Sequence, residues 1–77
     1  MNKQEILEQA LTARIAEVMH YQINIDNYTL AIQRIDELKD EELEEFKQRL
    51  TELLAAEKLE QKKSQVILHV IKQQLET

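Results

Sequence analysis

The strongest constraint on the fold of this chain is the absence of both glycine and proline from its 77 residues. These two residues build tight turns, strand ends and left-handed caps. A chain without them has few means of forming β-hairpin turns, bulges or phosphate-binding loops. What remains is rich in Leu, Ala, Glu, Gln and Lys, which are strong helix formers. The sequence therefore predicts an all-α protein of two or three long helices.

The length predicts a single helical domain over residues 1–77, near the size at which one core is only marginally stabilising. With no cysteine, disulfides are excluded and most zinc sites are disfavoured. No apolar run is long enough to span a membrane, and residues 1–5 carry no apolar signal core. We therefore expect a cytoplasmic protein with no membrane segment.

The first predicted helix covers about residues 3–37. Asn2 followed by Glu5 is typical of a capping box, which marks a helix start. From there a seam recurs at alternating steps of four and three residues, the period of a coiled coil. Arg14 is the one charged member of this seam. The others are Leu7, Leu11, Val18, Tyr21, Ile25, Tyr28, Ile32 and Ile35.

An acidic cluster, here called the acidic tip, precedes the second predicted helix, at about residues 40–76. Residues 36–45 have a net charge of −6, whereas the rest of the chain sums to +1. Asp40 is a suitable N-cap, and glutamates in the first turn stabilise the positive end of a helix dipole. The acidic tip consists of Asp36, Glu37, Asp40, Glu41, Glu42, Glu44 and Glu45.

The second helix carries its own apolar positions on both sides of a polar stretch, and they are Leu43, Phe46, Leu50, Leu53, Leu54, Leu68, Ile71 and Leu75. The step from Glu57 to Gln61 reads as a stutter in the heptad pattern. A turn near residues 38–39 would pair residue i with about 77 − i, so that Ile32 meets Phe46. We predict an antiparallel helical hairpin with coiled-coil packing. The alternative is a three-helix bundle with a break near residues 24–27.

The same register predicts a polar layer in the middle of the hairpin. It places Arg14 opposite the polar stretch of the second helix, where a carboxylate or an amide could bind the guanidinium. Polar layers of this kind fix the register of coiled coils. The predicted members are Arg14, Tyr21, Gln61 and Ser64, together with Glu57 or Glu60.

A second apolar strip, here called the outer strip, runs on the side of each helix away from the seam. It lies partly in a segment, residues 18–33, whose only charged residue is Asp26. A helix that is apolar on two faces must be covered on two faces. We therefore predict self-association into a helical bundle, or a protein partner, at this strip. Its members are Met19, Ile23, Leu30, Leu59, Val66 and Val70.

Catalytic chemistry has little support. The only serine is Ser64, in a helical stretch, and no glycine loop exists to hold a nucleotide. Glu17 and His20 form a Glu-x-x-His pair, the spacing of ligands in di-iron bundles. Two copies, with Glu57 or Glu60 at the matching level, would give a di-metal site in a homodimer. We keep that site as an alternative and predict a non-enzyme with no catalytic residue, cofactor or metal.

The segment Gln22–Ile32, QINIDNYTLAI, resembles stretches in small helical proteins of unknown function from tailed bacteriophages. This resemblance covers eleven residues, contains no defined motif and carries over no functional residue. It implies a phage or prophage accessory protein, located in the host cytoplasm.

These observations predict a non-enzymatic helical module for protein–protein interaction, such as a phage assembly factor or a host-factor antagonist. The chain has no basic face, which argues against direct nucleic-acid binding. An alternative is an acidic inhibitor, in which the acidic tip mimics nucleic-acid phosphates at a basic site.

Overall fold

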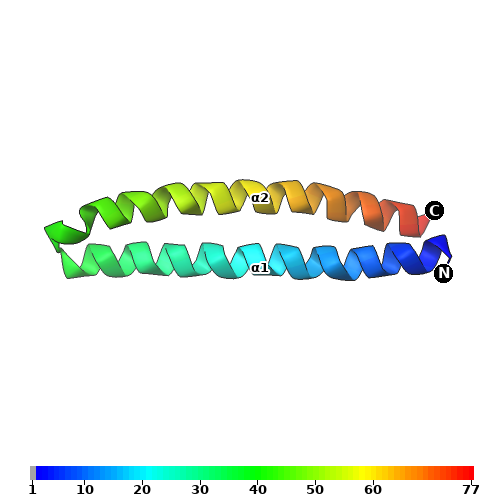
Figure 1. The fold of residues 1–77 in the computed structure, drawn as a ribbon, viewed down its shortest axis with the longest axis horizontal. Helices are drawn as coiled ribbons and strands as arrows, with labels where there is room; N and C mark the ends of the chain where they lie inside the picture. The colour runs from blue at the N-terminus through cyan, green and yellow to red at the C-terminus, as the bar shows by residue number, and fades with distance from the viewer. Residues whose placement is uncertain (1) are drawn as a thin grey trace.

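The fold is a long antiparallel hairpin of two α-helices, shown by a computed structural model that describes residues 2–77. Helix α1 spans Lys3–Leu38, a 3-10 turn η1 spans Glu41–Leu43, and helix α2 spans Glu44–Glu76. The helices run side by side and both termini lie at one end (Figure 1). The molecule measures 57 × 16 × 14 Å. The predicted all-α hairpin is confirmed.

Helix α1 continues without interruption through residues 24–27, so the three-helix alternative is wrong. Asn24, Asp26 and Asn27 are poor helix formers, but the seam residues among them, Ile25 and Tyr28, pack against α2. Packing of a helix face contributes more to helix stability than intrinsic propensity does. The local preference for a break is therefore overridden.

Polar side chains cap the starts of α1 and η1, whereas no side chain caps α2. Asn2 Oδ1 accepts a hydrogen bond of 2.8 Å from the backbone N–H of Glu5. Asp40 Oδ1 accepts one of 2.9 Å from the N–H of Glu42, and therefore caps η1 rather than α2. The second helix thus opens as a 3-10 turn, and its α-helical part begins at Glu44, four residues later than about residue 40 as predicted.

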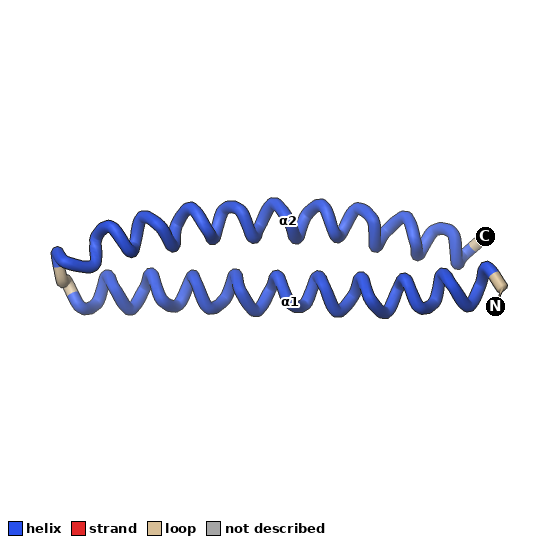
Figure 2. The backbone as a smooth tube through the Cα atoms, in the orientation of Figure 1, coloured by secondary structure: helices blue, strands red, loops and turns tan. Residues whose placement is uncertain are grey.

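The turn depends on one residue in the left-handed region. Lys39 has φ 51° and ψ 39°, and its N–H donates to Ile35 O over 3.3 Å (the bend is visible in Figure 2). Most helices that end this way have glycine at the position, because a Cβ atom disfavours positive φ. Without glycine, the chain turns at a lysine.

Replacing Lys39 with glycine is expected to raise the free energy of unfolding by up to about 1 kcal/mol, because it removes the Cβ penalty at positive φ. The matched control is Lys62→Gly, at an exposed position inside α2, which is expected to cost about 1 kcal/mol. Urea denaturation followed by circular dichroism measures both. Equal destabilisation by the two variants would contradict the left-handed geometry at residue 39.

The core lies along the seam between the helices. All nine seam positions predicted in α1 are buried or half-buried. The most buried hydrophobic side chains among the described residues are Ile25, Ile35, Leu50 and Ile71. Cross-helix contacts join residues whose numbers add to between 78 (Arg14 and Ser64) and 83 (Asp36 and Lys47), near the predicted register.

The seam of α2 differs from the prediction at two positions, because Leu53 is half-buried beside the seam and Phe46 is exposed. Phe46 is 52 % exposed, and Lys47 takes its place as a half-buried residue. With Lys47 included, the α2 seam is an unbroken heptad and the predicted stutter at Gln61 is wrong. Its members are Leu43, Lys47, Leu50, Leu54, Glu57, Gln61, Ser64, Leu68, Ile71 and Leu75.

Lys47 can occupy a seam position because its aliphatic stem packs while its charge reaches solvent and a partner. Its Nζ lies 2.6 Å from Asp36 Oδ1 on α1. The hydrogen bond and the charge of Asp36 raise the pKa of the Lys47 ammonium, with a smaller effect from Glu44. The pair therefore links the two helices at the acidic tip.

Candidate interaction site

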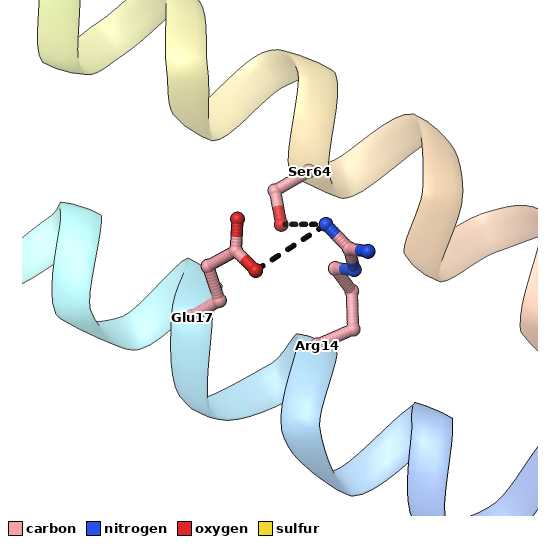
Figure 3. A network of polar contacts seen from close by, with 3 residues as sticks. All are labelled: Arg14, Glu17 and Ser64. Atoms are coloured by element: carbon pink, nitrogen blue, oxygen red, sulfur yellow. Dashed lines mark hydrogen bonds and ion pairs between the residues drawn. The ribbon is translucent and has the colours of Figure 1, made fainter.

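The polar layer lies about halfway along the hairpin. Arg14 Nη1 is 3.3 Å from Glu17 Oε2 and 3.5 Å from Ser64 Oγ, so the guanidinium bridges a carboxylate of its own helix and a hydroxyl of α2 (Figure 3). Ser64 is only 2 % exposed, which makes it the most buried residue named in the core. A small side chain at this seam position leaves room for the arginine.

Amide side chains extend the polar layer toward the acidic tip. Gln61 Nε2 donates to Val18 O over 3.2 Å and to Gln22 Oε1 over 2.9 Å. Asn24 Nδ2 donates to Glu57 Oε1 over 3.3 Å. The other carboxylate oxygen, Glu57 Oε2, is buried and has no hydrogen-bond partner.

Tyr21 lies among these carboxylates. The pKa of its phenol is raised, and partial desolvation is the largest cause. The charge of Glu17 and a hydrogen bond with Glu17 raise it further, and the charges of Glu60 and Glu57 have smaller effects in the same direction. Glu17 is on α1, whereas Glu57 and Glu60 are on α2, so carboxylates of both helices lie near the same hydroxyl. The hydrogen bonds of Arg14, Gln61 and Asn24 each cross between the helices, and together they favour one register.

The structure places every predicted member of the polar layer in the middle of the hairpin, but with different partners. The carboxylate bound to Arg14 is Glu17, three residues along the same helix, and not Glu57 or Glu60. Gln22 and Asn24 were not predicted to belong to the polar layer. Their positions next to the seam residues Tyr21 and Ile25 could have indicated this, because side chains that flank a seam face the neighbouring helix.

The outer strip is fully on the surface. Its six members are between 43 % and 62 % exposed, and they are Met19, Ile23, Leu30, Leu59, Val66 and Val70. Each helix turns its outer face away from the other, so the strip has two separate parts, one on each edge of the hairpin. A partner that covers one part leaves the other part open.

The acidic tip surrounds the turn, and all seven of its acidic residues are exposed. Asp36 is paired with Lys47 of α2, and Glu37 is paired with Arg34 over 3.2 Å. Asp40 caps the 3-10 turn. Three of the seven acidic side chains thus have a structural role in this end of the hairpin.

The predicted metal ligands do not converge within one chain. Throughout residues 2–77, no three His, Cys, Asp or Glu side chains are grouped so that they could hold a metal ion. His20 is exposed, and its ring contacts the Tyr21 ring edge-on, with 6.5 Å between centroids. None of the helices in the described part of the chain combines the length and apolarity that a membrane span needs.

Comparison of the chain with known protein families, with curated protein sequences and with solved structures finds no match.

Proposed function

We propose that this chain is a non-enzymatic helical interaction module. It self-associates, and it binds another protein through its outer strip. The observation that supports this function is the contrast between core and surface. Among the described residues, four hydrophobic side chains are buried in the seam, whereas eleven large ones are at least 40 % exposed. Exposed apolar surface of this extent is typical of interaction sites.

The structural chemistry agrees with a binding role. The polar layer and the Asp36–Lys47 pair fix the alignment of two rigid helices, which presents the outer strip with a constant shape. A preformed helix face loses little conformational entropy on binding. A phage assembly factor or a host-factor antagonist in the host cytoplasm would use such a surface, in line with the resemblance of residues 22–32.

The proposal is tested by substitution within the outer strip. An affinity-tagged chain captures partners from host lysate, and binding is then measured with the purified partner. Ile23→Glu with Leu30→Glu is expected to abolish binding, because both side chains are more than half exposed and the hairpin does not need them. The matched control is Gln9→Glu with Gln33→Glu, which adds the same charge at exposed polar positions. Equal binding by both variants would refute the proposal.

The acidic inhibitor stays the second candidate because all seven tip carboxylates are solvent-exposed. Glu41→Gln and Glu44→Gln are expected to lower stability by no more than about 1 kcal/mol each, the scale of helix-dipole effects. We expect partner binding to survive both changes and to depend weakly on salt. Loss of binding in a folded variant, with a steep salt dependence, would favour the acidic inhibitor.

A further inference from the structure

The two flanks of the seam differ in polarity. The seam residues of each helix occupy the heptad positions a and d. In an antiparallel coiled coil, the residues that directly precede the a positions of both helices lie on one flank of the seam. The residues that directly follow the d positions lie on the other flank. The contacts identify both flanks: Gln22–Gln61 and Asp36–Lys47 lie on one, and Asn24–Glu57 on the other.

The flank that contains Asn24 is here called the apolar flank. Its apolar members are Ala10, Ala31, Leu38, Phe46, Leu53 and Ile67, with Glu17, Asn24 and Glu60 near its middle and Lys3 and Gln74 toward the chain ends. The opposite, polar flank contains Glu8, Ile15, Gln22, Thr29, Asp36, Glu44, Thr51, Lys58, Gln65 and Lys72.

Large side chains on the apolar flank are open to solvent although they adjoin the core. Leu38 is 49 % exposed, Phe46 52 % and Ile67 44 %. In contrast to the outer strip, this flank is continuous with the seam, so a body packed on it would enlarge the existing core. Among the described residues, no large side chain is fully buried in the single hairpin.

The surface area gives an upper limit for the interface between two copies. Two separate chains expose about 11,900 Å², twice the 5970 Å² of one chain, whereas a compact body of twice 9.1 kDa has about 8,100 Å². Association into such a body would remove up to about 3,800 Å² from water. That total lies in the range of obligate homodimers, which begins at about 2,000 Å².

We propose that a second copy of this chain packs on the apolar flank, antiparallel to the first, to form a closed four-helix bundle. This inference deepens the self-association in the proposed function by naming the surface that the second copy covers. With one apolar flank for each chain, assembly ends at two copies. The outer strip then stays free for the different protein.

Charge complementarity selects the antiparallel orientation. Residues 21–60, the half with the turn, contain 11 acidic and 5 basic residues, a net charge of −6. The remaining residues contain 4 acidic and 5 basic ones, a net charge of +1. A parallel dimer would place the two strongly acidic halves side by side, whereas the antiparallel dimer places each against a weakly positive half. In that arrangement Leu53 lies at the level of Ile67 of the second copy.

Sedimentation equilibrium tests the choice of surface. Phe46→Glu is expected to raise the dimer dissociation constant at least about 100-fold, because dimerisation would bury its charge. Ile67→Lys, on the same flank, is expected to act in the same direction. Ile23→Glu, on the outer strip, is expected to change the constant less than about threefold. Circular dichroism of each variant establishes that the hairpin is retained.

If Ile23→Glu disrupts the dimer and Phe46→Glu and Ile67→Lys do not, the apolar flank is not the dimer interface. If the wild-type chain is a monomer, the proposed dimer does not exist. Failure of the proposed function gives a different result: the Ile23→Glu and Leu30→Glu double variant would still bind the partner protein. The orientation is tested by disulfide trapping, since the chain has no native cysteine. Mixed Leu53→Cys and Ile67→Cys chains are expected to form mostly the mixed disulfide. Its absence in a dimeric sample would overturn the antiparallel arrangement.

Discussion

Replacing Leu50 with alanine is expected to lower the free energy of unfolding by about 2–4 kcal/mol. Leu50 is 5 % exposed, the lowest value among the hydrophobic residues of the seam. Truncating a buried leucine loses the transfer free energy of the removed atoms and leaves a cavity that rigid helices fill only in part. A domain of this size has a total stability of only about 4–12 kcal/mol, so the loss is a large fraction of it. Urea denaturation monitored by circular dichroism gives the change.

The matched control is Leu59→Ala, the same truncation on the same helix at a side chain that is 53 % exposed. We expect a change of no more than about 0.5 kcal/mol, the usual range for surface substitutions. Equal losses for Leu50→Ala and Leu59→Ala would mean that the seam does not carry the stability of the hairpin.

Replacing Arg14 with alanine is expected to cost about 1–3 kcal/mol. The change leaves the hydroxyl of Ser64, which is 2 % exposed, without its charged partner, and it removes the cation beside Glu17. A buried polar group that loses its hydrogen bond costs about this much. Arg34→Ala is the control, because the Arg34–Glu37 pair has the same spacing but both side chains are about two-thirds exposed. Its expected cost is below about 0.5 kcal/mol.

Replacing Arg14 with leucine and Ser64 with alanine together is expected to hold or raise the melting temperature. An apolar pair of suitable volume avoids the desolvation cost of a partly buried ionic group. The double variant is also expected to populate more than one assembly state, because the polar layer no longer fixes the register. A loss of stability in the double variant as large as in Arg14→Ala would show that the polar layer is a net source of stability.

The hairpin was predictable because the heptad of α1 runs unbroken from Leu7 to Ile35 and because no glycine or proline interrupts it. The path of the turn was not predictable to the residue. Lys39 adopts a left-handed conformation that lysine rarely takes, and Asp40 caps a 3-10 turn before α2 begins. Both features result from closing two packed helices over a short connection.

The misassignment of Phe46 has a simple physical cause. A pattern based on hydrophobicity prefers phenylalanine to lysine, yet the heptad step of four after Leu43 falls on Lys47. The lysine stem is apolar enough for the seam, and Asp36 is placed to receive the ammonium. The partner of Arg14 was missed for a related reason, because a carboxylate three residues away on the same helix competes with those across the seam.

The central claim is that this hairpin completes its core by association, and sedimentation equilibrium of the wild-type chain over a 100-fold concentration range tests it most directly. The account predicts the mass of a dimer at the higher concentrations, and a melting temperature that rises with concentration as the dimer forms. A chain that sediments as a monomer throughout, with a cooperative melt independent of concentration, would contradict it.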